Sequence, residues 1–222
     1  MKINAVTRPA NSLVEGFRKV ESSTLSDVLD TLNINGVASG IRPITSQISA
    51  IGPAITVRQI ACTMGTYTDA DFCMADILDF AEPGDVLVFD NAGLEISTWG
   101  GLASTAAKVK GIEGTIIDGA CRDVSQTIEI GYPVFSRHIT PRTGKTRLKM
   151  VELNSPVQCG GVRVNSGDIM VADQTGVVVV PALKAHEVLD KALANEAKEN
   201  EFFEQLMKGK SFKEMQQKTG RV

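Results

Sequence analysis

GTIIDGACRD, residues 114–123, is an apolar run that ends in an arginine beside an aspartate. Gly114–Ile117 predicts a buried strand, and a helix is expected to begin near Val124. Ligands of α/β proteins gather at the carboxyl ends of parallel strands, which is where Arg122 and Asp123 would lie. The stretch therefore predicts a site that holds an acidic substrate and a divalent cation together, as chemistry on a small keto acid requires.

The segments before this stretch alternate between helix and strand patterns. The order strand, helix, strand implies parallel pairing with a crossover. The hydroxyl residues at positions 22–24 offer N-caps for the earliest of the helices. The predicted elements are a helix over Leu25–Leu32, a strand over Ile55–Cys62, a helix over Ala70–Phe80, a strand over Val86–Phe89 and a helix over Trp99–Val109.

The segments after the stretch change character. Three short apolar runs, Val162–Val164, Ile169–Ala172 and Val177–Val180, are separated by Gly or Asp residues and predict closely connected strands. Pro181 suits the first turn of a long helix that reaches about Met207. The second half of the chain is therefore expected to supply short strands followed by a helix.

Length and pattern together predict one compact α/β unit. With 222 residues, 43% of them hydrophobic, the chain can bury a substantial core. The expected fold is a swivelling or barrel-like β/β/α sheet core with flanking helices and a long C-terminal helix. We expect a single domain over residues 1–222, with residues 183–222 as a C-terminal helical extension.

Charge and cysteine usage exclude several classes of partner. The net charge of −3 gives no general attraction to polyanions, so nucleic acid is not expected as a ligand. The four cysteines lack the close pairing of a zinc site and are expected to be reduced. The N-terminus has no apolar signal core, and no run approaches the ~20 apolar residues of a membrane span. We therefore expect a cytoplasmic protein without membrane partners.

The segment Ser97–Ala103, STWGGLA, is the first candidate binding site. Ser97 or Thr98 can cap a helix whose first amides are unpaired, and Gly100 and Gly101 let a ligand approach that backbone. Amides at a helix N-terminus favour a carboxylate or phosphate. The alternative is that the two glycines only allow the helix to pack closely against the sheet.

Arg122 and Asp123 are the second candidate site. An Arg side chain can grip a carboxylate or polarise a keto oxygen, and an Asp completed by waters and substrate oxygens can hold magnesium. The alternative is an ion pair that caps a helix over Val124–Ile130. Two roles are open for Asp118, which are to orient the Arg122 side chain and to act as a buried cap. The basic segment Arg137–Lys149 favours a solvated loop over a surface that attracts an acidic substrate or a protein partner.

Five stretches besides residues 114–123 resemble a single family. They are Trp99–Ala103 (WGGLA), Gly131–Phe135 (GYPVF), Pro156–Val162 (PVQCGGV), Gly167–Ile169 (GDI) and Asp173–Val177 (DQTGV). The family is that of the regulator of ribonuclease E activity A and the 4-hydroxy-4-methyl-2-oxoglutarate aldolases, called RraA-like. The resemblance implies the family fold, a homotrimer or homohexamer and, in the aldolases, cleavage that depends on Mg²⁺ or Mn²⁺ and releases pyruvate.

The resemblance also implies a role for each matching residue. Arg122 and Asp123 would be catalytic, with the metal at Asp123. The aldolases usually carry an acid where this chain has Gly101, and its absence is the one departure from the family pattern. The implied substrate-binding groups are the guanidinium of Arg122 and the backbone of Gly100, Gly101, Leu102 and Ala103.

The predicted C-terminal helix carries an irregular stripe. Its apolar face runs from Leu189 through Phe203 to Leu206 and is interrupted by Glu196 and Glu199. We hypothesise that Glu199, which the resemblance favours, reaches the site of a neighbouring subunit and handles water or protons there as a catalytic residue. The alternative is that both acids face solvent or pair loosely with nearby lysines.

Two classes of function follow from these patterns. The first is a metal-dependent lyase acting on a short 2-keto acid, in which Arg122 helps to stabilise an enolate. Retro-aldol cleavage and decarboxylation of oxaloacetate both leave electrons on the carbon next to the keto group, so the sequence favours neither. The second is a non-catalytic, protein-binding regulator. His138 and His186 fall in no matching motif and are predicted to be structural.

Overall fold

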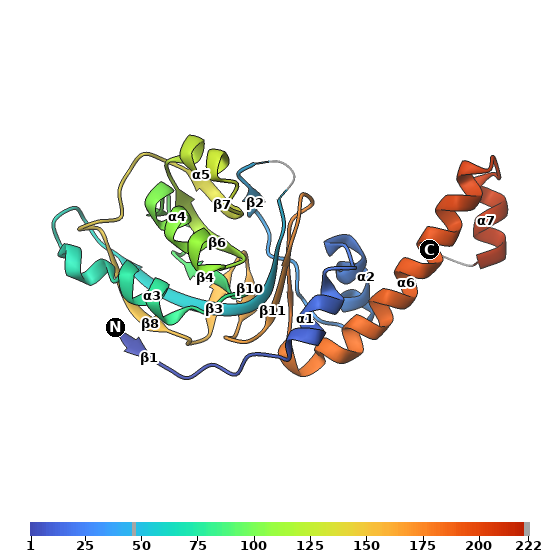
Figure 1. Cartoon of the computed structure of the whole chain (residues 1–222), viewed down its shortest axis with the longest axis horizontal. Coiled ribbons are helices and arrows are strands. Elements are labelled where there is room, and N and C mark those ends of the chain that lie inside the picture. The colour runs from blue at the N-terminus through green and yellow to red at the C-terminus, as the bar shows by residue number, and fades with distance from the viewer. Residues whose placement is uncertain (46–47, 220–222) are drawn as a thin grey trace.

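The centre of the molecule is a set of four parallel strands in the order β3–β4–β6–β7, within a ten-stranded sheet. The structure, a computed structural model, describes residues 1–45 and 48–219. Helices α3, α4 and α5 lie in the crossovers between these strands, on the same side of the sheet (Figure 1). This confirms the parallel pairing predicted from element order. The bounds are β3 Ala50–Ala61, α3 Met74–Phe80, β4 Val86–Asp90, α4 Gly101–Lys110, β6 Gly114–Cys121, α5 Val124–Ile130 and β7 Val134–Ile139.

The central strands are apolar along their length because both of their faces are covered. Leu87 and Phe89 of β4 belong to the core beneath the helices, where they join Trp99. Val86 and Val88 belong to the core on the opposite face. A strand buried on both faces needs no alternation of polar and apolar residues, which explains the continuous run in β4.

Shorter strands extend the sheet and cover its second face. β8 and β11 pair antiparallel with β3, β2 pairs antiparallel with β7, and β5 pairs parallel with the end of β6. The hairpin β9–β10 packs over the face opposite the helices and produces the predicted β/β/α arrangement. The bounds are β1 Lys2–Ile3, β2 Arg42–Pro43, β5 Ser97–Trp99, β8 Leu148–Leu153, β9 Val157–Cys159, β10 Val162–Val164, β11 Ile169–Ala172 and β12 Val177–Val180. The last three match the predicted strands.

Helices α1, α2 and the first part of α6 gather beside β11 and β12 in a separate apolar cluster. Helix α6 leaves this cluster and projects from the body, and α7 folds back at its far end (Figure 1). The α/β class with a long C-terminal helix is thus confirmed, whereas the division at residue 183 stays a prediction. No helix in the described part of the chain is both long and apolar enough to cross a bilayer. The bounds are α1 Asn11–Phe17, α2 Ser22–Thr31, η1 (a 3-10 helix) Asp69–Phe72, η2 (also 3-10) Ala182–Lys184, α6 Ala185–Met207 and α7 Phe212–Thr219.

The predicted first residues of two helices are not α-helical in the structure. Trp99 is the last residue of strand β5, and α4 begins only at Gly101. The segment predicted as one helix to Phe80 is broken at Cys73, whose left-handed φ of 43° separates η1 from α3. Both errors arise because apolar spacing continues across a change of backbone direction.

Two side-chain predictions on α2 and α6 are also wrong. Helix α2 starts at Ser22 without a side-chain cap, and the Ser22 hydroxyl donates to Asp173 at 2.8 Å instead. On α6 the stripe includes Phe202, which is 4% exposed, rather than Phe203, which is 62% exposed. The reason is that α7 packs there, with the Phe202 and Phe212 rings edge to face at 5.0 Å.

Candidate active site

Strand β5 brings the start of helix α4 to the end of strand β6. Ser97 pairs opposite Ala120, and Trp99 pairs opposite Cys121. The N–H of Arg122 then donates to the Trp99 carbonyl oxygen at 2.9 Å, which anchors the turn after β6 to the chain entering α4. The two candidate segments of the sequence therefore form one site, at the carboxyl end of the parallel strands.

Asp123 joins the two halves of this site. Its φ of 55° is left-handed, a conformation that costs energy outside Gly and concentrates at functional sites. Its Oδ2 accepts a hydrogen bond from the Gly101 N–H at 3.1 Å and lies 3.5 Å from Arg122 Nε. The side chain makes no capping bond to α5, so the capping part of that alternative is wrong, whereas its Arg122–Asp123 ion pair is present. The carboxylate caps α4 instead.

The guanidinium of Arg122 keeps most of its hydrogen-bonding capacity. Its side chain is 39% exposed, and within residues 1–45 and 48–219 its only ion pair is the one with Asp123. Its two terminal nitrogens are therefore available to a planar carboxylate or a keto oxygen. Asp118 does not orient it, because Asp118 accepts hydrogen bonds from Arg137 Nε and the Gly160 N–H, both at 2.7 Å. Asp118 instead joins β7 to the turn between β9 and β10, and it caps no helix of the described residues.

Arg122 and Asp123 line a cavity of about 220 Å³ together with the first turn of α4. In the described structure, the N–H groups of Leu102 and Ala103 have no hydrogen-bond partner. Unpaired amides at the start of a ten-residue helix favour a negative group. The cavity can thus receive an anion between these amides and the guanidinium. Its other lining residues are Phe72, Met74, Ser97, Thr98, Trp99, Gly100, Thr143 and Lys145.

The packing alternative placed Gly100 and Gly101 against the sheet, but the side chains nearest to them are those of Asp123, Arg122 and Gln126. A Cβ atom at Gly100 would lie 2.5 Å from Asp123 Oδ2 and would displace that carboxylate. A Cβ atom at Gly101 would lie 2.0 Å from Oε1 of Gln126, the end of a flexible, exposed side chain. Gln126 thus occupies the space into which a side chain at position 101 would project. The Gly101 N–H, expected to bind substrate, is already bonded to Asp123.

A divalent cation fits the Asp123 carboxylate. Oδ2 is bonded to the Gly101 N–H, whereas Oδ1 has no hydrogen-bond donor among the described residues, and the side chain is 44% exposed. Magnesium is commonly held by one or two carboxylates, with waters and substrate oxygens as its other ligands. The described residues contain no group of three or more His, Cys, Asp or Glu that would enclose a metal, as a structural zinc site would.

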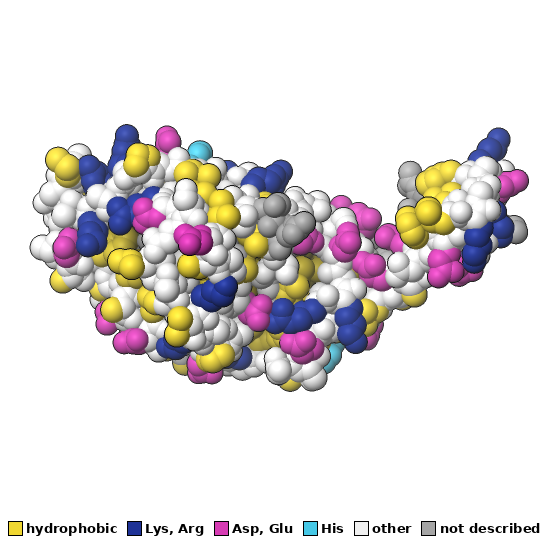
Figure 2. All heavy atoms as spheres, turned by 45° about the horizontal axis from the view of Figure 1, so that its top comes forward, with side chains coloured by type: hydrophobic (Ala, Val, Ile, Leu, Met, Phe, Trp, Pro, Cys, Tyr) yellow, Lys and Arg dark blue, Asp and Glu magenta, His cyan; other side chains and the backbone are white. Residues whose placement is uncertain are grey.

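Glu199 does not reach this cavity within one chain. It belongs to the second half of α6. Figure 2 shows acidic side chains gathered between the body and the projecting end of the molecule. Burial raises the pKa of Glu199 above its ordinary value of 4.5, and the negative charges of Glu196, Asp27 and Glu21 raise it further. Its predicted catalytic role stays a prediction that requires a neighbouring subunit.

The basic segment Arg137–Lys149 is not a uniform solvated loop, so that prediction is wrong for its two ends. Arg137 lies in β7 and is bonded to Asp118, and Lys149 lies in β8 and pairs with Asp71 at 3.0 Å. Lys145, in the loop between them, lines the cavity. No pattern in the sequence distinguished Lys145 from its basic neighbours, because only the fold brings it to the cavity that Arg122 also lines.

The two histidines lie outside the cavity. Nε2 of His138 is 3.2 Å from the Gly93 carbonyl oxygen, and His186 is exposed on α6. Neither lines the space around Arg122 and Asp123. Proton transfer in this cavity therefore has to involve other groups or water.

The sequence of the chain matches one protein family and several of its members. The family model described as "RraA-like: Aldolase/RraA" matches residues 22–179. A putative 4-hydroxy-4-methyl-2-oxoglutarate aldolase of Halalkalibacterium halodurans is 33% identical over 182 residues, which are 82% of this chain and 82% of that protein. Protein DlpA of Legionella pneumophila is 34% identical over 82% of this chain, but this match spans only 30% of its length.

Two solved structures share the fold over almost the whole chain. An uncharacterized protein from Pseudomonas syringae has a TM-score of 0.85 and 30% identity, covering 95% of this chain and 99% of that one. RraAS2 of Streptomyces coelicolor, described as an unusual member of the RNase ES inhibitor RraA protein family, has a TM-score of 0.79 and 31% identity. That match covers 88% of this chain and 98% of RraAS2.

Proposed function

The chain belongs to the RraA-like family, and we propose that it is a divalent-metal-dependent lyase that cleaves a short 2-keto acid and releases pyruvate. One observation carries the proposal. The unpaired end of Arg122, the unpaired amides of Leu102 and Ala103 and a free oxygen of Asp123 all border one small cavity. This combination of donors and one acceptor is the one that a keto acid and its cation need.

Each group has a distinct role in the proposed reaction. The α4 amides bind the carboxylate of the keto acid, with the helix dipole adding to the attraction. Arg122 donates to the keto oxygen, where negative charge grows during cleavage. Asp123 holds the cation, which would supply a Lewis acid beside the same oxygens. Because Gly101 fixes the Asp123 carboxylate by a hydrogen bond, these groups are held in place before substrate binds.

Two reactions share this chemistry. In both, the bond between carbons 3 and 4 breaks, its electron pair passes toward the keto group as the pyruvate enolate, and carbon 3 then takes up a proton. In retro-aldol cleavage the 4-hydroxyl loses its proton and carbon 4 leaves as a carbonyl group. In decarboxylation of oxaloacetate, carbon dioxide leaves. Arg122 would assist either reaction equally, since the charge develops on the same oxygen.

A second copy of the chain would complete the site in this proposal, as a homotrimer or homohexamer. Glu199 has no ion-pair partner in the described part of its own chain, and α6 projects from the body (Figure 1). The exposed Lys145 at the cavity offers a complementary charge. Glu199 of a neighbouring copy would then transfer the proton that the histidines are too distant to handle.

A protein-binding regulator without turnover is the second candidate function. Gly101 favours it, because the neutral amide of Gln126 occupies the space into which a side chain at position 101 would project, which leaves one negative charge fewer beside Asp123 than an acid there would give. The similarity to RraAS2, described as a member of an RNase inhibitor family, adds to this possibility. In that case the cavity would persist as part of the fold.

Pyruvate release tests the proposal directly. We expect the chain to release pyruvate from 4-hydroxy-4-methyl-2-oxoglutarate or oxaloacetate with Mg²⁺ or Mn²⁺, and to stop when a chelator is added. Asp123→Asn should lose this activity and also bind Mn²⁺ more weakly in calorimetry. Asp30→Asn, an exposed change on α2, is the matched control and should leave both unchanged. An active Asp123→Asn variant would reject the metal role, and a wild-type chain inactive on both keto acids would favour the regulator.

A further inference from the structure

The last turns of α6 and helix α7, residues 201–219, form an arm that extends from the body (Figure 1). Inside the arm the rings of Phe202 and Phe212 meet edge to face at 5.0 Å, and Phe202 is 4% exposed. Three large apolar side chains nevertheless remain accessible, since Phe203 is 62% exposed, Met207 73% and Phe212 62%. Figure 2 shows hydrophobic side chains gathered on this projecting end.

These three side chains adjoin one another. Phe203 and Met207 are four residues apart on α6, so they are neighbours on the surface of that helix. The ring of Phe212 joins them from α7, because it contacts Phe202, the residue before Phe203. Single apolar residues on a surface are ordinary, whereas an adjoining group marks an interaction site. Since the arm extends away from its own body, the cover for this group must come from another chain.

The charges of the arm are divided along its length. Residues 201–207 contain two acids and no cation, whereas residues 208–213 contain three lysines and no acid. All five charged side chains are exposed, and within residues 1–45 and 48–219 one contact of 3.7 Å between Lys208 and Glu204 joins them. A long, exposed contact of this kind contributes little. The five residues are Glu201, Glu204, Lys208, Lys210 and Lys213.

This division makes the arm complementary to a second copy of itself. A twofold axis brings residue i of one copy to residue j of the other, and j to i, so the surface has to match itself. A second arm turned end over end would place its basic half against the acidic half of the first. The apolar side chains of both arms would then meet at the centre, where interfaces are enriched in Phe and Met, with charges at the rim. A partner of uniform charge would match only one half of the arm.

We propose that the arms of two copies pair in antiparallel orientation. Phe203, Met207 and Phe212 form the centre of the contact, and the acids of each arm face the lysines of the other. The contact uses the arm beyond residue 200, so Glu199, at its base beside Asp27 of α2, stays available to the site of a neighbouring copy. Pairing through a twofold axis makes the number of copies even, and a homohexamer would be two trimers joined by three pairs of arms. The inference stands apart from the proposed lyase function.

A charge at the centre of the contact tests the apolar part. Met207→Glu should halve the mass of the assembly in analytical ultracentrifugation, because two buried carboxylates would oppose each other. Circular dichroism should show the same helix content as wild type, since this side chain is exposed within one chain. Leu183→Glu is the matched control, at a fully exposed apolar residue outside the arm, and should keep the wild-type mass. An unchanged mass in Met207→Glu, or an odd number of copies in wild type, would overturn the proposal.

Exchange of charges tests the orientation of the two arms. Glu201→Lys combined with Glu204→Lys gives a basic arm, and Lys210→Glu combined with Lys213→Glu gives an acidic arm. Each double variant alone should have half the wild-type mass at low salt, because like charges then oppose each other. An equimolar mixture of the two should regain the wild-type mass. A mixture that stays at half mass would reject the pairing of arms and favour contact between the arm and the body of another copy.

Discussion

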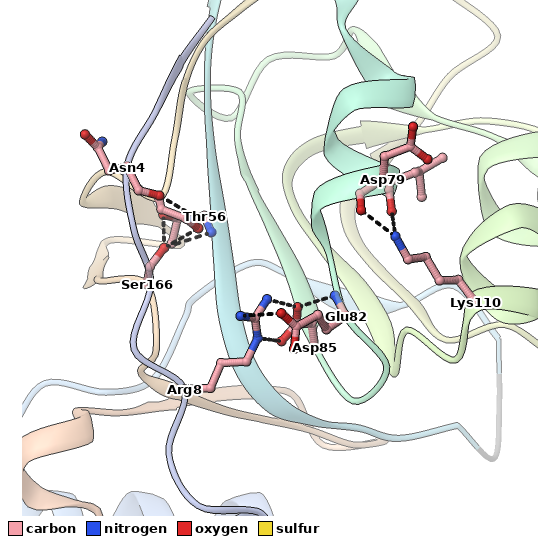
Figure 3. A network of polar contacts seen from close by, with 10 residues as sticks. Asn4, Arg8, Thr56, Asp79, Glu82, Asp85, Lys110 and Ser166 are labelled. Carbon is pink, nitrogen blue, oxygen red and sulfur yellow. Dashed lines mark hydrogen bonds and ion pairs between the residues drawn. The ribbon is translucent and has the colours of Figure 1, made fainter.

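Two Arg–Asp pairs lie at opposite ends of the central parallel strands and differ in what they leave unsatisfied. At the amino end, just before β4, Arg8 meets Asp85 through two parallel hydrogen bonds of 2.8 Å (Figure 3). The Asp85 side chain is fully buried and also accepts from the Glu82 N–H at 2.7 Å. At the carboxyl end, Arg122 and Asp123 share one contact of 3.5 Å.

The comparison shows that pairing alone does not distinguish a structural from a functional ion pair. Arg8 has a second carboxylate, Glu82, at 3.1 Å, so its donors are used within the protein. Arg122 has free terminal nitrogens, and Asp123 a free oxygen, beside a cavity. The informative quantity is the hydrogen-bonding capacity that remains after the fold has formed. By this measure each nitrogen of Arg8 has a carboxylate partner, whereas the carboxyl-end pair is available to a ligand.

The sharpest test of this contrast is Arg122→Ala. We expect kcat/KM for pyruvate release to fall about 10²–10³-fold, because a donor to a developing oxyanion is lost. The free energy of unfolding should change by no more than about 0.5 kcal/mol, since the half-exposed pair contributes little. Steady-state kinetics and urea denaturation measure the two effects. Arg122→Lys, which keeps the charge but not the planar fork, should lie between wild type and Ala.

A large loss of stability in Arg122→Ala would contradict the contrast, because it would make this pair structural as well. Retained activity would remove Arg122 from the proposed chemistry.

Arg8→Ala should give the opposite result. It leaves the buried Asp85 carboxylate without its cation, which costs about 3 kcal/mol of unfolding free energy. Activity per folded molecule should stay unchanged, because Arg8 is at the other end of the strands from the cavity. Arg18→Ala is the matched control. Its pairs with Glu15 and Glu113 are partly exposed, so about 0.5 kcal/mol is expected. Equal effects of the two variants in urea denaturation would contradict the buried pair's role.

Glu199→Gln extends the comparison to a carboxylate that has no cationic partner among residues 1–45 and 48–219. Because burial and the nearby acids raise its pKa in the folded chain, its proton is held more tightly there than in the unfolded chain. The stability gained from this tighter binding of the proton is present below pH 4.5 and is lost as the pH rises through the raised pKa of Glu199 in the folded chain. At pH 7 the Gln variant should therefore melt at a slightly higher temperature than wild type, and the difference should shrink toward pH 4.

Glu201→Gln, an exposed change on the same helix, serves as the control and should melt like wild type at both pH values. A Glu199→Gln variant that gains stability only at low pH would show that the sign is wrong. Measurements at one fixed protein concentration keep any association between copies constant.

The sequence predicted well those features that depend on a few neighbouring residues. The runs at residues 162–164, 169–172 and 177–180 are strands, α5 begins at Val124, and α6 ends at Met207. The strand-end position of Arg122 also followed, because ligands of α/β proteins gather at the carboxyl ends of parallel strands, whereas the joining of Arg122 with Gly100 in one site was implied by the family resemblance. Such predictions succeed because periodicity and turn residues report local burial.

Contacts between distant segments were not predictable in the same way. Asp118 is bonded to Arg137 and not to Arg122, because β6 and β7 are neighbours in the sheet. Gln59 meets Thr98 although they belong to strands that are not paired with each other. Lys145 lines the cavity from a loop whose basic residues look alike in the sequence.

Local patterns along the chain were thus enough to predict the α/β class, most of the elements and the edge of the sheet where the candidate site lies. Which polar groups are bonded within the protein, as at Asp85, and which remain free, as at Arg122 and Gln59, became visible only in the folded chain. Periodicity depends on neighbours along the chain, whereas a hydrogen bond depends on the register and packing of segments far apart in it.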